Sequence, residues 1–136
     1  MSKIFIFDTN SLVSAALFSS STNRIALDKA IDIGELAISD QTFDELIDVI
    51  FRKKFDKYFI DEHERWSLVN KVEINAKLFT VNSLITDCRD LKDNKFLGLA
   101  IDSKADCINS GDTDLLVLHP FRNIPILNAV GFINTF

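Results

Sequence analysis

Proline and glycine are scarce in this sequence, which has 2 prolines and 4 glycines among 136 residues. Because flexible linkers are rich in these residue types, their scarcity leaves little room for a linker between domains. The length is also typical of one folded unit that encloses its own core. We therefore expect a single domain over residues 1–136.

Cysteines and long apolar runs are few as well. Cys88 and Cys107 lack the spacing of a metal-binding pair, so we expect free thiols in a reducing cytoplasm. No uninterrupted apolar run approaches the length that crosses a membrane. The apolar stretch near the N-terminus already ends at Asp8, too early for a signal peptide. These features predict a cytoplasmic protein without a membrane partner.

Basic residues are outnumbered, since 15 Lys and Arg face 20 Asp and Glu for a formal net charge of −5. This balance argues against passive binding of nucleic acid, which usually requires a basic surface. It does not argue against a metal-dependent nuclease. Such an enzyme gathers carboxylates in its own site and neutralises them with cations.

Hydrophobic residues are plentiful at 47%, and 12 of them are phenylalanines, so we expect a core rich in Phe. Apolar runs that read as buried strands alternate with stretches of helical periodicity. We predict strands over 3–7, 36–39, 106–109 and 124–128, with 82–86 as a further candidate. We predict helices over 11–18, 23–35, 39–55, 60–79, 93–105 and 129–136, and a short helix within 110–118. The alternation indicates an α/β fold with a mainly parallel sheet.

Acidic residues recur where the predicted strands end. Asp8 directly follows the first strand, and Asp112 and Asp114 follow the strand over 106–109. Asp93 begins a crossover helix, and Glu45 lies in the first turns of another. In parallel sheets the carboxyl ends of the strands and the starts of the crossover helices share one edge, where ligands bind. We therefore expect these acids to lie close together.

Carboxylates that meet at one edge repel each other unless a cation binds or some of them stay protonated. An oxygen-rich set without His or Cys suits Mg²⁺ or Mn²⁺. Structural roles also remain open for the same residues. Asp8 and Asp93 are suited to cap helices, Glu45 has capping-box spacing from Thr42, and Asp114 is either a metal ligand or a cap.

Five segments in order resemble the PIN domain family, most closely the subgroup of toxins from toxin–antitoxin pairs (VapC-like). They read FDTNSLVSAAL, TFDELIDVI, DCRDLKDNKFLGLAI, SGDTDLLVL and IPILNAVGFI. Each segment alone is weak evidence for the family, but the order and spacing of the five together are strong evidence. The resemblance implies a PIN-like sheet of about five parallel strands flanked by helices, and a metal-dependent ribonuclease.

The resemblance also implies roles for particular residues. The catalytic and metal-binding acids of the family fall on Asp8, Glu45, Asp93 and Asp112, with Asp114 as a further metal ligand. Supporting positions fall on Asn10, Ser110 and Asp90. One departure is that Ser110 stands where the subgroup usually has Thr before Gly-Asp, and a hydroxyl is kept.

The implied chemistry is hydrolysis of single-stranded RNA with Mg²⁺ or Mn²⁺, which leaves a 5′-phosphate and a 3′-hydroxyl. The implied partners are a small antitoxin protein and a second copy of the chain in a homodimer. Two alternatives stay open. The first is a non-catalytic scaffold of the same fold that binds RNA or protein. The second is a phosphohydrolase of the haloacid dehalogenase type, which Asn10 disfavours because that chemistry wants an Asp there.

Overall fold

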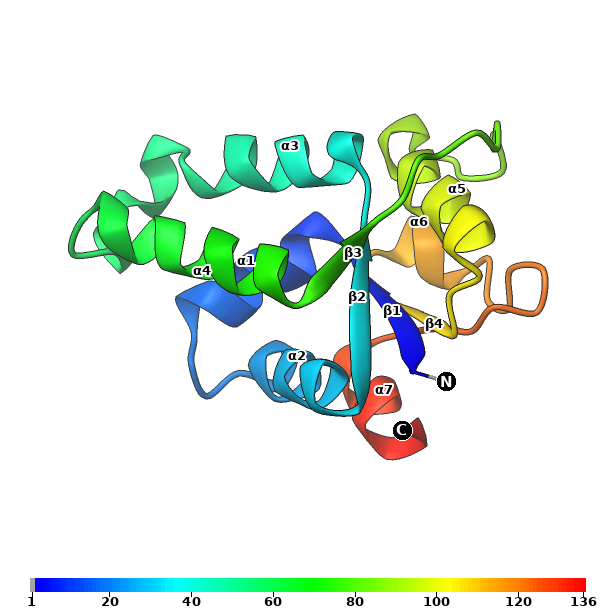
Figure 1. The fold of residues 1–136 in the computed structure, drawn as a ribbon, viewed down its shortest axis with the longest axis horizontal. Coiled ribbons are helices and arrows are strands. Elements are labelled where there is room, and N and C mark those ends of the chain that lie inside the picture. Colours follow the sequence, from blue (N-terminus) through cyan, green and yellow to red (C-terminus); the bar gives the residue numbers. More distant parts are fainter. Residues whose placement is uncertain (1) are drawn as a thin grey trace.

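The structure, a computed structural model that describes residues 2–136, is an α/β fold built on one parallel sheet (Figure 1). The sheet has five strands in the order β3-β2-β1-β4-β5, and every pair is parallel. The strands are β1 Lys3–Phe7, β2 Gly34–Ile38, β3 Ala76–Leu78, β4 Cys107–Asn109 and β5 Ile126–Leu127. The predicted fold class is therefore confirmed.

Helices connect the strands. They are α1 Thr9–Leu17, α2 Thr22–Ile33, α3 Asp40–Ile50, α4 Glu62–Ile74, α5 Asn94–Ser103, α6 Thr113–Leu116 and α7 Ala129–Thr135. Two 3₁₀ turns, η1 Lys53–Tyr58 and η2 Leu91–Asp93, precede α4 and α5. Within residues 2–136, none of these helices has the length and apolar character needed to cross a membrane.

The strand order reverses at β1. The chain runs from β1 outward through β2 to β3, and then returns to place β4 on the other side of β1. Phe7 at the end of β1 pairs with Asn109 at the end of β4, so the next residues, Asp8 and Ser110, emerge side by side. Such a reversal leaves a crevice at the carboxyl ends of the strands, where α/β proteins bind ligands.

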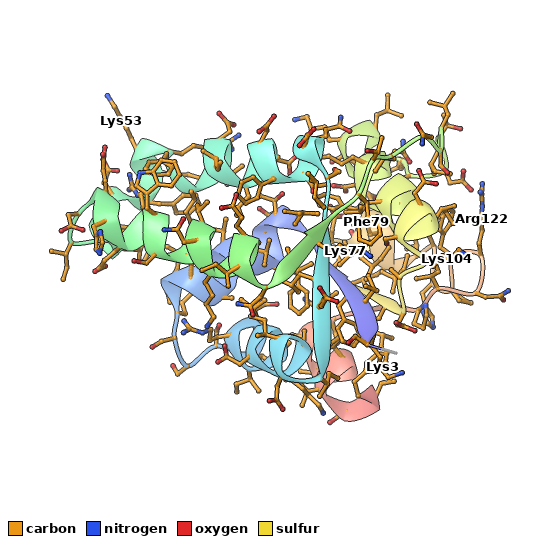
Figure 2. All side chains as sticks on the ribbon, in the orientation of Figure 1. Lys3, Lys53, Lys77, Phe79, Lys104 and Arg122 are labelled. Carbon is orange, nitrogen blue, oxygen red and sulfur yellow. The ribbon has the colours of Figure 1, made fainter. Side chains whose placement is uncertain are left out.

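The helices α3 and α4 form an arm that extends away from the sheet, joined by η1 at its far end (Figure 1). Lys53 lies at that far end in Figure 2. Arg65 of α4 contacts η1 and the residues that flank it. It is 7% exposed, donates a hydrogen bond to Asp56 and lies over the rings of Phe51 and Phe59. A buried guanidinium needs such partners because an unpaired charge is costly to bury.

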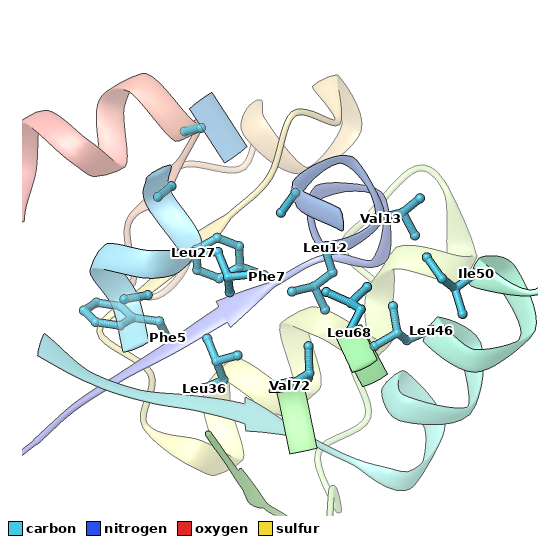
Figure 3. Packing of buried hydrophobic residues seen from close by; sticks show 14 of the residues in the cluster. Phe5, Phe7, Leu12, Val13, Leu27, Leu36, Leu46, Ile50, Leu68 and Val72 are labelled. Carbon is cyan, nitrogen blue, oxygen red and sulfur yellow. The ribbon is translucent and has the colours of Figure 1, made fainter. Parts of the chain in front are cut away.

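Alternating residues of each strand face two separate cores, as the period of a strand requires. Phe5 and Phe7 of β1 point into the core that α1, α2, α3, α4 and α7 cover (Figure 3). Ile6, between them, points into the opposite core, which α5 and α6 cover. The first core is rich in Phe as predicted, and Phe5 meets the ring of Phe132 edge to face at 5.0 Å. Both faces of β1 are thus buried, which explains its uninterrupted apolar sequence.

Gly34 lies at the junction of α2 and β2, where close packing leaves no space for a larger residue. A Cβ atom at this position would lie 2.3 Å from the backbone oxygen of Lys3 on the neighbouring strand. The helix expected over 23–35 ends at Ile33, and Gly34 is its C-cap. Its φ of −167° is extended, however, so the usual left-handed glycine cap is not the cause.

Several predicted boundaries are wrong. The helix expected over 60–79 ends at Ile74, and its last residues form β3 instead, so 82–86 is not needed as a strand and is irregular. The helix expected over 39–55 ends at Ile50. Its capping box joins Ser39 to Thr42 rather than Thr42 to Glu45, which leaves the Glu45 side chain free for other contacts.

Candidate metal site at the carboxyl edge of the sheet

Asp8 is held in place at the point where β1 becomes α1. Its side chain caps α1 by accepting from the Ser11 N–H at 2.9 Å, and its other oxygen accepts from the Ser110 hydroxyl at 2.5 Å. The residue is 4% exposed, and this burial raises its pKa despite those hydrogen bonds. Asp8 is therefore both a helix cap and a fixed carboxylate at the crevice.

Asp90, Asp93 and Asp112 form the tightest acidic cluster of residues 2–136. Each offers an oxygen atom, and these oxygens lie within 4.8 Å of one another. Asp93 ends the turn η2 before α5, Asp90 caps the start of that turn, and Asp112 comes from the loop after β4. Segments that are far apart in the sequence thus deliver acids to the same place.

Asp93 does not act as the helix cap that its position at the start of α5 predicts. Within residues 2–136 its side chain makes no capping hydrogen bond, and its Oδ2 atom is buried without a partner. A buried oxygen without a donor is costly, and in a native protein it calls for a bound group. Asp90 takes the local structural role instead, because its side chain accepts from the Lys92 N–H at 3.1 Å.

The pKa of Asp93 is raised to about 7. Burial is the largest cause, followed by the close approach of the Asp112 carboxyl group and the negative charges of Asp112, Asp90 and Asp8. The charge of Asp8 is the smallest of these causes, since Asp8 lies outside the cluster of Asp90, Asp93 and Asp112. Near neutral pH the crevice therefore holds more negative charge than its surroundings stabilise.

Ser110 links the acids that follow β1 and β4. Its hydroxyl donates to Asp8, and the same oxygen accepts from the Asp112 N–H at 3.0 Å. Asp112 in turn caps α6, since its side chain accepts from the Asp114 N–H at 2.8 Å. The expected supporting position of Ser110 agrees with these contacts, and a threonine there would supply the same hydroxyl.

Glu45 lies at the edge of this group and is neutralised by a base. One carboxylate oxygen accepts from the Thr9 hydroxyl at 2.6 Å, and the other pairs with the ammonium group of Lys95. The Lys95 side chain is 11% exposed and the Glu45 side chain 29%, so the lysine end of the pair is the better shielded from water. The carboxylate of Glu45 is thus oriented from both sides.

The remaining predicted residues lie farther out. Asp114 receives hydrogen bonds from the exposed Arg89, the shorter at 3.0 Å, and the cap of α6 is Asp112 rather than Asp114. Asn10 is exposed on the first turn of α1. The structure therefore brings Asp8, Asp90, Asp93 and Asp112 together, and places Glu45, Asp114 and Asn10 around them.

The donor set fits a hard divalent cation. Carboxylate oxygens are the preferred ligands of Mg²⁺ and Mn²⁺, and the cluster supplies them from Asp90, Asp93 and Asp112. The unpartnered Oδ2 of Asp93 is an additional oxygen that such an ion would satisfy. Asp90, which the sequence places only among the supporting residues, is as close to this set as the others.

Sequence reasoning overlooked Thr9 and Lys95, which orient Glu45. Thr9 follows Asp8 directly, so its hydroxyl beside the first acid could have been identified from the sequence as part of the site. Lys95 gave no such signal, because its pairing with Glu45 exists only once α5 packs near α3.

The fold and the acidic crevice first define a class: an α/β protein with carboxylates gathered at the strand-order reversal of a parallel sheet. Residues 5–114 match the PIN domain family, and the chain belongs to that family. The resemblance found in the sequence is thereby confirmed.

A solved structure shares this fold. The chain is similar to the crystal structure of VapBC2 from Rickettsia felis bound to a DNA fragment from their promoter, with a TM-score of 0.62 and 14% identity. The match covers 92% of this chain and 98% of the other. A comparison with curated protein sequences gives no match.

The raised pKa of Asp93 predicts a pH-dependent stability in EDTA. Because the folded pKa of about 7 lies above the ordinary pKa of 3.8 for an aspartate, protonation of Asp93 stabilises the fold at low pH, and this contribution is lost as pH rises through 7. Asp93→Asn stays neutral, so its melting temperature relative to wild type should increase between pH 5 and pH 8, by on the order of a few degrees. A difference in melting temperature between the variant and wild type that does not increase from pH 5 to pH 8 would contradict this account.

The ion pair of Lys95 and Glu45 predicts that removing the lysine charge makes the fold more dependent on Mg²⁺ for its stability. Lys95→Met removes a positive charge beside the acids, so we expect lower stability in EDTA and a larger rise in melting temperature on adding Mg²⁺. Lys104→Met, at the other end of α5, makes the same change in charge on an exposed residue and should leave the Mg²⁺ response unchanged. An equal response in both variants would show that Lys95 does not influence the metal site.

Proposed function

We propose that this protein is a metal-dependent endoribonuclease that cleaves single-stranded RNA with Mg²⁺ or Mn²⁺. The observation that carries the proposal is the cluster of Asp90, Asp93 and Asp112 beside Asp8, with a buried oxygen of Asp93 left unpartnered. Membership of the PIN domain family supports the same reading, because PIN domains are generally nucleases.

The acids divide into groups with different tasks. Asp8 and Asp93 would be direct ligands, joined by Asp90 and Asp112, and deprotonation of Asp93 is required before its oxygens can bind a cation. When bound, the ion lowers the pKa of a water molecule and stabilises the charge that develops on the phosphate. Glu45, oriented by Thr9 and Lys95, would align the attacking water. The expected products carry a 5′-phosphate and a 3′-hydroxyl.

The distribution of charge supports a single-stranded substrate. The labelled basic side chains are spread over the molecule, with Lys53 at the end of the arm, Lys77 near the middle of the view, and Lys104 and Arg122 at the other end (Figure 2). Such a scattered arrangement does not match the regular phosphates of a duplex. A flexible single strand can bring one phosphate to the acidic crevice without a continuous basic surface.

We further propose that the protein acts in the cytoplasm as the toxin of a toxin–antitoxin pair. The support is the PIN family assignment and the fold shared with VapBC2, which was solved bound to a DNA fragment from their promoter. The partner would be a small antitoxin protein. Exposed apolar side chains, among them Trp66 at 43% and Val130 at 56%, are available for such a contact or for a homodimer.

Cleavage of a mixed pool of single-stranded RNA tests the enzymatic proposal. Wild type should cleave with Mg²⁺ and lose activity in EDTA. Asp8→Asn should lower the rate by at least about a hundredfold, because the amide keeps the hydrogen bond from Ser11 but lacks the charge that a cation needs. Asp44→Asn, an exposed residue beside Glu45, is the matched control and should cleave at the wild-type rate.

The outcome also separates the alternatives. A folded Asp8→Asn variant with wild-type activity would reduce Asp8 to a helix cap. Equal cleavage in EDTA would exclude the metal mechanism. No cleavage by wild type under any divalent cation, with RNA still bound, would favour the non-catalytic scaffold.

The homodimer is tested by light scattering of the purified protein. We expect a mass near twice 15.4 kDa at micromolar concentration, because a dimer buries exposed apolar surface. Trp66→Ser and Val130→Ser, on different faces, identify which surface is involved, since only the interface variant should shift the mass to the monomer. A monomer at the highest soluble concentration would overturn the dimer.

A further inference from the structure

A polar groove borders the acidic crevice. Its lining residues are Asn10, Ser11, Ser14, Asn23, Gly111 and Asp112. The first three come from α1, Asn23 comes from the start of α2, and Gly111 and Asp112 belong to the loop after β4. Because Asp112 is also part of the acidic cluster, the groove opens directly beside the proposed cleavage site.

The lining has the chemistry of a nucleoside site rather than a phosphate site. Asn and Ser side chains offer hydrogen-bond donors and acceptors, and among the described lining residues none is basic. A second groove is lined by Lys92, Lys95, Asn94 and apolar residues such as Leu91, and is better suited to a phosphate. The volume of the polar groove, about 300 Å³, is at the lower end of the range of about 300–1,000 Å³ for small-molecule sites.

Gly111 keeps this groove open. No atom lies within 4 Å of the position that a Cβ would take there, so packing does not require a glycine. Its φ also lies outside the left-handed region, so backbone conformation does not require one either. What the missing side chain provides is free space next to Asp112.

A buried amide outside the groove contacts one of the lining residues through its backbone. Asn109 is 1% exposed, and neither polar atom of its side chain has a partner within residues 2–136. Its backbone oxygen accepts from the hydroxyl of Ser11, which lines the groove. Unpaired buried amides are costly, and a bound polar ligand or water is the usual compensation.

We propose that this groove is a nucleoside subsite, which binds the base and ribose of the nucleotide next to the scissile phosphate. Asn23 reads the base or ribose by hydrogen bonds, and Gly111 sets the size of nucleoside that enters. This inference rests on the proposed ribonuclease function and adds a position at which the enzyme distinguishes nucleotides.

The first test maps the ends of RNA fragments from a mixed pool cleaved with Mg²⁺. Wild type should favour certain bases at one position next to the cut. Asn23→Ala should weaken that preference by about fivefold, the change expected for one hydrogen bond, and Gly111→Leu should abolish it by filling the groove. Asn134→Ala, an exposed residue on α7, is the matched control and should keep the wild-type preference.

The second test needs no cleavage and therefore separates the two proposals. The four ribonucleosides are titrated into the isotope-labelled protein in EDTA, and amide chemical shifts are recorded. We expect shifts at Gly111, Ser14 and the Asn23 side chain, and their loss in Gly111→Leu.

Each result has a definite meaning. Metal-dependent cleavage with an unchanged base preference in both groove variants and no shifts at these residues overturns the subsite and leaves the nuclease intact. Nucleoside shifts at the groove without cleavage by wild type would show that the groove binds nucleosides, but would overturn the nuclease and with it a subsite beside a scissile phosphate.

Discussion

The parallel pairing of β1 with β4 is the constraint on which the candidate site depends. Its register places Phe7 beside Asn109, and the residues that follow, Asp8 and Ser110, then share a hydrogen bond. Ser110 also receives the N–H of Asp112 and so fixes the third position of the site. A slip of one residue in this pairing would turn these side chains to the other face of the sheet.

The site brings several negative charges together, and the contacts of these acids compensate most of that charge. Asp8 is stabilised by donors from Ser11 and Ser110, and Glu45 by Lys95 and Thr9, whereas Asp93 keeps a buried oxygen without a donor. The raised pKa of Asp93 reports that imbalance. A proton or a divalent cation relieves the same repulsion, so stability and metal binding are linked through one residue.

Sequence reasoning succeeded best where a local pattern had a single explanation. The uninterrupted apolar run of β1 indicated a strand buried on both faces, and Asp93 could be placed at the start of α5. It failed at β3, because residues 76–78 continue the helical periodicity of α4 and become a strand only by pairing with β2. It also misassigned the capping box of α3, where Ser39 and Thr42 compete with Glu45 for the same backbone groups.

The sequence by itself determined the α/β class, the family and the places where acids follow strands, because these depend on residue types at short spacing. Only the tertiary structure decided which acids approach one another. Asp90 joins the cluster through the turn η2, and Lys95 reaches Glu45 through the packing of α5 near α3. Distances between side chains on separate elements follow from strand order and helix packing, and spacing along the chain carries no record of them.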